Sequence, residues 1–203
     1  KNDLLNAPET YMNKISVNTS ETGVVDLDYS LKKNIHNLAE YKNKKPENIT
    51  ACILNRPRHK NIIEELKVLG VKLKLISDGD VSGAILVTDE KYGIDIFLGI
   101  GGGPEGVLAA SALDAYNCKF QGRFIFETEK DKKRASQMGI KDFDKKYELK
   151  EIVSGDSIFC ATGITSGDLV SGVKKIDNEF LTETLITHKS CGVRKVVKNR
   201  IKI

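Results

Sequence analysis

The sequence predicts an α/β protein in which helices cover both faces of a sheet. Short apolar segments bounded by turn residues alternate with segments of helical periodicity, which is typical of α/β sheets. Most of the apolar segments fit buried parallel strands better than half-exposed hairpins. The five candidate strands are Thr50–Asn55, Val71–Ser77, Ile94–Ile100, Arg123–Glu127 and Ser157–Ala161.

Helical patterns lie between these strands. Lys60–Leu69 collects its apolar residues on one face, and Gly70 is a stop signal. The other expected helices are Asp28–Tyr41, Val107–Tyr116 and Thr128–Met138.

Three further segments complete the expected organisation. Val81–Thr88 fits a helix and a strand equally well. Phe180–Val197 alternates polar and apolar residues, which favours antiparallel strands. Val17–Leu27 and Tyr147–Asp156 are the expected connecting segments.

Length and composition indicate an ordinary globular protein. The 203 residues, 40% hydrophobic and 30% charged, allow one good-sized core or two small lobes. No apolar run approaches the roughly 18 residues that span a bilayer, so we expect no membrane partner. The chain begins at Lys1 with neither an initiator Met nor the apolar core of a signal peptide. We therefore expect a cytoplasmic protein whose given sequence starts inside a longer reading frame.

Cysteines and charge give weaker information. The four cysteines lack metal-ligand spacing, and Cys52 and Cys160 fall in expected buried strands, so we predict reduced core thiols. The net charge of +4 includes basic clusters at Lys130–Arg134 and Arg194–Lys202. No aromatic residues interleave with these clusters, which favours solvated surfaces over contacts with nucleic acid.

The loops that follow the strands carry the most informative chemistry. In a parallel sheet, the loops leaving the carboxyl ends of strands open onto one edge, where ligands bind. Together they would place two guanidinium groups, several carboxylates and a glycine turn on one rim. These junctions are Asn55–His59, Ser77–Asp80, Gly101–Gly106 and Thr162–Asp168.

The first two junctions each allow two interpretations. Arg56 and Arg58 flank a proline and suit bidentate capture of phosphate, but they could equally pair with surface acids. His59 could cap the next helix or add positive charge, and we assign it no catalytic role. Asp78 and Asp80 could bind a metal or accept bonds from sugar hydroxyls, although Asp-Gly-Asp is more often only a turn.

The glycine turn is the strongest single signal. Pro104 stands where a helix would begin, and a helix N-terminus with bare N–H groups stabilises an anion. Glu105 could bind a metal or simply stabilise the helix dipole, and the two interpretations are about equal. The glycines also satisfy a dinucleotide-binding fingerprint, with Glu127 as the ribose acid, but Pro104 and Glu105 occupy the place of the pyrophosphate.

Five motifs in register resemble the C-terminal part of class II fructose-1,6-bisphosphatases, the GlpX-type family. The resemblance runs from about Pro8 to Val197 and so covers nearly all of the chain. The motifs are Asn55-Arg-Pro-Arg-His59, Asp78-Gly-Asp80, Gly99-Ile-Gly-Gly-Gly-Pro-Glu-Gly106, Phe120-Gln-Gly-Arg123 and Phe159-Cys-Ala-Thr-Gly163.

The resemblance implies a layered α/β sugar phosphatase fold like that of the inositol phosphatases. It further implies hydrolysis of the 1-phosphate of fructose 1,6-bisphosphate with Mg or Mn, in gluconeogenesis. Arg56 and Arg58 would hold a phosphate, Asp78 and Asp80 the sugar hydroxyls, and Glu105 a metal. The substrate-binding residues that it implies are Tyr11, Arg56, Pro57, Arg58, Asp78, Gly79, Asp80 and Gly102.

The resemblance also implies that residues 1–203 are only the substrate-binding part. The family's other metal-binding carboxylates and its attack-assisting threonine belong to an N-terminal half upstream of the region matching Lys1, where the catalytic residues are expected. The alternatives are a non-catalytic phosphosugar-binding module, a nucleotide-dependent oxidoreductase, or sedoheptulose bisphosphate as the substrate. We also expect a homo-oligomer.

Overall fold

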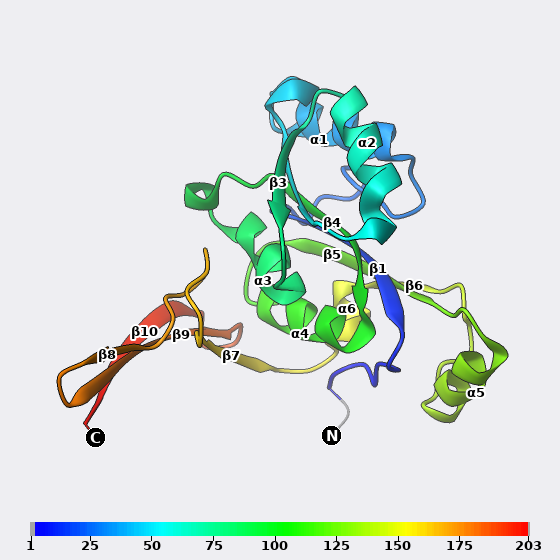
Figure 1. Ribbon diagram of the computed structural model, residues 1–203. Helices are drawn as coiled ribbons and strands as arrows, with labels where there is room; N and C mark the ends of the chain where they lie inside the picture. Colours follow the sequence, from blue (N-terminus) through cyan, green and yellow to red (C-terminus); the bar gives the residue numbers. More distant parts are fainter. Residues whose placement is uncertain (1–2, 203) are drawn as a thin grey trace.

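The computed structural model describes residues 3–202, and a six-stranded sheet lies at its centre (Figure 1). The strand order is β3-β2-β4-β1-β5-β6. The strands are β1 (Tyr11–Val17), β2 (Thr50–Leu54), β3 (Lys72–Ile76), β4 (Ile96–Gly102), β5 (Lys119–Ile125) and β6 (Lys146–Glu148).

The sheet is mixed, so the prediction of parallel strands holds only for part of it. β2 pairs in parallel with β3 and with β4, as expected. The strand β1 was missed, and it lies between β4 and β5, antiparallel to both. Polar residues at Asn13, Lys14 and Ser16 hide this central strand from a search for apolar runs. The strand expected at Arg123–Glu127 is β5, which begins earlier, at Lys119.

Helices cover both faces of this sheet, as predicted. On one face lie α1 (Leu31–Tyr41) and α2 (Lys60–Val68); on the other lie α3 (Asp80–Ile85), α4 (Gly103–Leu113) and α6 (Leu149–Ile152). The helix α5 (Glu129–Gln137) follows β5 near one end of the molecule (Figure 1). The ambiguous segment after Asp80 is helical, with a short 3-10 turn at Leu86–Thr88.

Side-chain alternation along the strands builds a separate core on each face. On β4, Phe97 points toward α3 and α4, whereas Ile96 and Leu98 point toward α1 and α2. Phe97 and Ile96 are both fully buried. Each such side chain contributes about 1.5–3 kcal/mol of burial free energy, which fixes the strand register on both sides.

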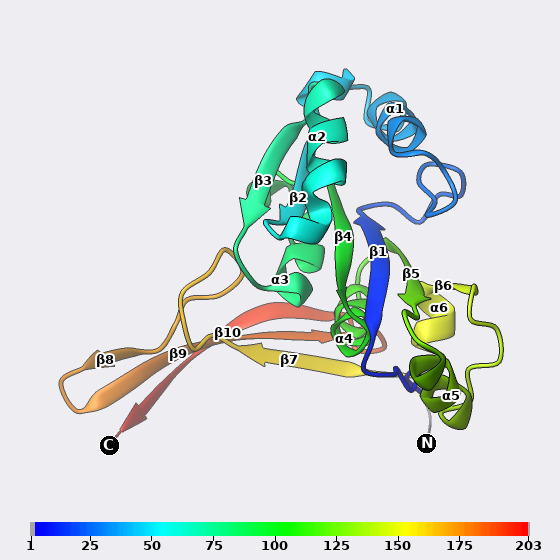
Figure 2. The same ribbon diagram turned by 45° about the vertical axis from the view of Figure 1, so that its right-hand side comes forward.

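A second sheet lies on the far side of α3 and α4, so the architecture is layered (Figure 2). Its strands are β7 (Ile158–Thr162), β8 (Lys174–Ile176), β9 (Glu179–His188) and β10 (Val193–Lys202). β9 and β10 form the predicted antiparallel pair and extend beyond the helices as a long hairpin (Figures 1 and 2). The strand expected at Ser157–Ala161 is β7, which pairs antiparallel with β9 and does not belong to the first sheet.

This second sheet corrects the interpretation of one cysteine. Cys52 is buried on β2, and burial raises the pKa of its thiol to about 12. Cys160 is exposed, because alternate residues of β7 face solvent while Phe159 packs inward.

The basic clusters on α5 and β10 are largely exposed, as predicted.

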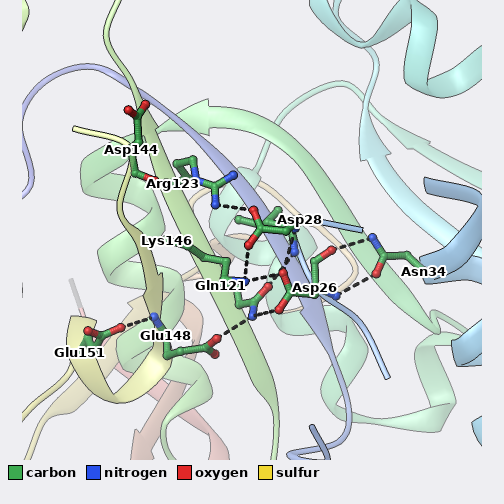
Figure 3. Close-up of polar contacts among 10 residues, drawn as sticks. Asp26, Asp28, Asn34, Gln121, Arg123, Asp144, Lys146, Glu148 and Glu151 are labelled. Carbon is green, nitrogen blue, oxygen red and sulfur yellow. Dashed lines mark hydrogen bonds and ion pairs between the residues drawn. The ribbon is translucent and has the colours of Figure 1, made fainter. Parts of the chain in front are cut away.

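A polar network fastens the connecting segment after β1 to the sheet edge (Figure 3). Gln121 on β5 is fully buried; its side-chain NH₂ donates to Asp26 at 3.1 Å and its carbonyl accepts from the Leu27 N–H at 2.8 Å. Lys146 on β6 donates to Asp26 at 2.5 Å and to Asp28 at 2.6 Å.

The prediction of a connection at Tyr147–Asp156 is only partly right, since this stretch also contains the end of β6 and all of α6.

No helix within residues 3–202 is long and apolar enough to cross a membrane.

Candidate functional site

Three of the four predicted junctions meet at one edge of the first sheet. They follow β2, β3 and β4, whose parallel pairing brings their carboxyl ends together. A cavity of about 330 Å³ lies between them. Its lining consists of Leu54, Arg56, Arg58, Asp78, Gly79, Asp80, Val81, Gly101, Gly102 and Glu105.

The two arginines of the first junction differ in how firmly they are held. Pro57 begins a 3-10 turn that points both side chains at the cavity. Arg58 donates from Nε to the Ile100 carbonyl at 2.7 Å, and its guanidinium carbon lies 5.0 Å from the centroid of the Tyr11 ring. Arg56 is exposed, and its Nη2 lies 3.9 Å from Asp78 Oδ1. Arg58 is therefore preorganised, whereas Arg56 is free to move onto a ligand.

His59 neither caps α2 with its side chain nor adds positive charge. It is fully buried, with Nδ1 donating to the Leu54 carbonyl and Nε2 accepting from the Ile100 N–H, both at 2.7 Å. Burial is the main cause that lowers the pKa of His59, so the neutral ring is favoured. Gly99 leaves room for this ring, since a Cβ there would lie 3.1 Å from Nε2.

The second junction places two aspartates in different environments. Gly79 has a φ of +91°, a left-handed conformation that lets the chain turn sharply between them. The side chain of Asp78 is 93% exposed, whereas that of Asp80 is only 12% exposed at the start of α3. Among the described residues, Asp80 Oδ1 is buried without a hydrogen-bond partner. This oxygen is therefore available to accept a bond from a ligand.

Lys14 was not among the predicted site residues, although it contacts the second and third junctions of the rim. It is fully buried on β1, forms an ion pair with Asp80 Oδ2 and donates to the Gly102 carbonyl at 3.0 Å. Burial lowers the pKa of Lys14 and outweighs the opposing effect of Asp80. The only signal in the sequence is its position two residues from Met12 and from Ser16, on the same face of the strand.

The third junction is the glycine turn, and it has the predicted strand–turn–helix form. β4 ends at Gly102, α4 begins at Gly103, and Pro104 is its second residue. The Glu105 carboxylate lies against the Gly102 backbone, so a side chain at position 102 would collide with it. A second cavity of about 590 Å³ shares Gly102 and Glu105 with the first and reaches Tyr11. Glu105 therefore stands between two adjoining cavities.

These residues make at most part of a metal site. Within residues 3–202, no group of three or more His, Cys, Asp or Glu side chains converges in a way that could hold a metal ion. Glu105 can offer one ligand at the helix N-terminus, and further carboxylates of the second cavity, such as Glu9 and Glu127, are spread around its lining. The ligation of a metal by Glu105 remains a prediction.

The fourth junction does not share the rim. It follows β7 of the second sheet, and Asp168 forms an ion pair with Lys74 at 2.7 Å. Its loop lines a different hollow of about 670 Å³, which shares Asp78, Gly79 and Val81 with the lining of the rim cavity. That hollow is larger than the cavity at the rim, but neither Arg56 nor Arg58 lines it.

The topology also argues against a dinucleotide site. The fingerprint requires β4, α4 and β5 to form a unit of neighbouring parallel strands, but β1 lies between β4 and β5. The carboxylate of Glu105 covers the Gly102 backbone that a pyrophosphate would have to approach. The glycines therefore form a turn that differs from the dinucleotide-binding turn.

The fold and the site define a layered α/β protein with a cavity whose rim carries arginines, carboxylates and a helix N-terminus. The chain belongs to the family described as bacterial fructose-1,6-bisphosphatase, glpX-encoded, which matches residues 1–201. This confirms the family resemblance and the α/β fold class.

Curated relatives agree with this assignment. The chain is 37% identical, over 92% of its length, to a D-fructose 1,6-bisphosphatase class 2/sedoheptulose 1,7-bisphosphatase of Synechococcus sp. (strain JA-3-3Ab), 57% of which is covered. It is 37% identical, over 97% of its length, to a fructose-1,6-bisphosphatase class 2 of Haemophilus influenzae, 63% of which is covered. The chain thus spans about three-fifths of the length of these relatives.

Proposed function

We propose that this chain is the substrate-binding part of a metal-dependent phosphatase. The proposed reaction is hydrolysis of the 1-phosphate of fructose 1,6-bisphosphate, giving fructose 6-phosphate and phosphate. The observation that carries the proposal is the cavity of about 330 Å³, in which Arg56 and Arg58 share a lining with Asp80 and the glycine turn. Paired guanidinium groups suit a phosphate, and an unpartnered carboxylate oxygen suits a sugar hydroxyl.

Each residue of the rim has a proposed role. Arg58, already fixed by Ile100 and the Tyr11 ring, provides rigid N–H donors to a phosphate, and Arg56 closes over the same group. Asp80 accepts a bond from a sugar hydroxyl through Oδ1, and the exposed Asp78 binds at the mouth of the cavity.

The remaining residues of the rim position these groups. Pro57 and Gly79 shape their loops, Tyr11 lines the adjoining second cavity, and the Gly102 backbone, which lines both cavities, is the proposed backbone contact of the ligand.

Glu105 is the proposed metal ligand. When bound, Mg or Mn would polarise the phosphoryl oxygen and generate a hydroxide-like nucleophile. The described residues do not form a complete set of ligands, so we propose that the other ligands and the catalytic residues come from outside residues 3–202. Without a bound metal, the carboxylate of Glu105 would stabilise the dipole of α4.

The wider setting is part of the same proposal. The reaction belongs to gluconeogenesis, and we propose a cytoplasmic homo-oligomer. The names of the relatives from Synechococcus and Trichodesmium erythraeum include sedoheptulose 1,7-bisphosphatase, which makes the seven-carbon sugar bisphosphate a second candidate substrate.

Calorimetric titration of the chain with fructose 1,6-bisphosphate tests the binding proposal. We expect saturable binding that either Arg56→Ala or Arg58→Ala weakens by about 1.5–3 kcal/mol, since each removes a charge-assisted hydrogen bond. Absence of binding by the parent chain would contradict the proposal, and so would variants that lose stability but bind normally.

Phosphate release in the presence of Mg or Mn, measured on a protein that also contains the proposed additional ligands and catalytic residues, then separates an enzyme from a binding module. Release that Glu105→Gln abolishes without unfolding the protein supports the metal assignment. Activity that survives this change contradicts that assignment. Saturable binding without release under either metal favours the non-catalytic phosphosugar-binding module.

A further inference from the structure

A fully buried lysine needs a reason, because lysine is almost never fully buried unless it is paired. Lys14 lies on β1 between Met12 and Ser16, on the face that packs against α3 and α4. Its ammonium reaches the start of both helices, since Asp80 is the first residue of α3 and Gly102 precedes α4. One side chain thus connects the second and third junctions of the rim.

The first contact fixes a peptide group. Lys14 donates to the Gly102 carbonyl at 3.0 Å, and the N–H of Gly103 in the same peptide donates to the Thr10 carbonyl at 2.7 Å. Both sides of this peptide are therefore held by the segment that contains β1. Because this peptide lies at the start of α4, its orientation sets the position of Glu105 in the first turn of the helix.

The second contact orients a carboxylate. Lys14 forms its ion pair with Oδ2 of Asp80, while Oδ1 is buried and has no hydrogen-bond partner among the described residues. A buried carboxylate oxygen left unpaired is unfavourable until a donor arrives. Lys14 therefore holds Asp80 with one oxygen occupied and the other ready for a donor from the ligand.

Lys14 also balances the charge of the rim. Arg56 and Arg58 provide two positive charges, against three carboxylates at Asp78, Asp80 and Glu105. With the ammonium of Lys14, the positive charges equal the negative charges in number. Without it, the rim would carry a net negative charge facing a phosphate anion, which like-charge repulsion disfavours.

We propose that Lys14 is a positioning residue for the sugar-binding end of this site, acting through Asp80 and the Gly102–Gly103 peptide. The inference rests on the proposed function, because it assumes that the ligand is a phosphorylated sugar with a hydroxyl donor for Asp80. It predicts that Lys14 and Asp80 act on ligand binding as one unit.

A double-mutant cycle tests this coupling by calorimetric titration with fructose 1,6-bisphosphate. Lys14→Met and Asp80→Asn should each raise the Kd by about tenfold to a hundredfold, which corresponds to a lost charge-assisted interaction. The double variant should bind no more weakly than the weaker of the two single variants. Additive losses, or Lys14→Met binding as tightly as the parent chain, would overturn the proposal.

Lys44→Met is the matched control. Lys44 pairs with the buried Asp95 at 2.8 Å, just before β4 begins and away from the rim, and Asp95 keeps Lys42 at 3.1 Å. This variant should leave the Kd unchanged. Lys14→Met alone leaves the buried carboxylate of Asp80 without its partner, which can prevent folding. In the double variant both side chains are neutral, so its Kd can still be compared with that of Asp80→Asn to test the inference.

A second measurement separates this inference from the proposed function. If the parent chain does not bind the sugar bisphosphate, the proposed function fails, and amide hydrogen exchange by NMR then decides the role of Lys14. The Gly103 N–H should exchange at least about tenfold faster in Lys14→Met, but not in Lys44→Met, because its peptide loses one of its two anchors. An unchanged exchange rate at Gly103 would overturn the proposal.

Discussion

At the scale of single residues, Arg58 and His59 fix one residue of β4 from both sides. Arg58 holds the carbonyl of Ile100, and His59 Nε2 accepts from its N–H, each at 2.7 Å. The loop that carries the arginines is thereby tied to the strand that leads into the glycine turn. Protonation of Nε2 would remove the acceptor, so this connection requires a neutral ring.

The neutral His59 predicts a pH-dependent loss of stability. Burial, together with the nearby Arg58 charge, lowers the pKa of His59 below its ordinary value of 6.5, although two backbone hydrogen bonds and Asp80 oppose this. As the pH falls below 6.5, the unfolded chain therefore takes up the proton before the folded one, and the free energy of unfolding decreases. We expect His59→Gln, whose amide supplies a donor and an acceptor without titrating, to flatten this decrease.

Urea unfolding at about pH 7.5 and about pH 5.5 measures this difference. His36 and His188 are present in both proteins, so the comparison isolates His59. Equal losses of stability in the parent chain and in His59→Gln would show that His59 does not titrate as we infer.

Residue types alone predicted which side chains meet at the cavity, but not the residues that support them. Arg56, Asp80 and Glu105 stood out because charges beside glycine and proline are unusual at strand ends. Lys14 and His59 did not, because a lysine taken alone is usually a surface residue and a histidine is found both buried and exposed. Their roles depend on β1 lying beside β4, which no local pattern in the sequence encodes.

At the scale of elements, the segment between β1 and α1 has no regular structure and depends on the network in Figure 3. Asp26 accepts bonds from Lys146, Gln121 and the Asp28 N–H. Burial alone would raise the pKa of Asp26, but these donors outweigh it and lower the pKa to about 2. The ionised carboxylate thus fastens the segment to β5 and β6.

We predict that this fastening is lost in acid. Because the folded pKa of about 2 lies below the ordinary 3.8, the contribution of Asp26 is present above pH 3.8 and disappears as the pH falls toward 2. Asp26→Asn should lower the free energy of unfolding on the order of 1 kcal/mol near pH 6, and the difference should shrink near pH 3.

Urea unfolding across this pH range measures the effect, with Glu129→Gln as the control. Glu129 forms an exposed pair with Lys132 within α5, so its loss should change little at any pH. A stability difference for Asp26→Asn that does not change with pH would argue against an ionised Asp26 in the network.

The elements were predicted more reliably than their pairing. Most of the expected helices and strands are present within a few residues, because an apolar face with a glycine stop or a proline start is a local signal. Strand direction is not local, since an apolar run such as β7 looks the same in a parallel or an antiparallel sheet. This is why the junction at Thr162–Asp168 was expected on the rim and lies beside it.

At the scale of the whole molecule, the two sheets are joined through a small apolar contact. Its buried members are Ile85 of α3, Ala112 of α4, Phe159 of β7 and Leu185 of β9. Thr187 adds a hydrogen bond to the Ala112 carbonyl at 3.3 Å. The first sheet, in contrast, has an extensive core on each face, so the second sheet is the less firmly held layer.

We therefore predict that Phe159→Ala loosens the second sheet before the first. Removing this buried ring should cost about 3 kcal/mol, most of it in the attachment of β7 and β9 to α4. In hydrogen exchange measured by mass spectrometry, β7 and β9 should lose protection while β1 and β4 keep theirs. Ile158→Ala is the matched control, since its side chain is 67% exposed on the other face of the same strand and should matter little. Equal loss of protection in both sheets would mean instead that the layers unfold as one cooperative unit, and that the rim depends on the second sheet for its stability.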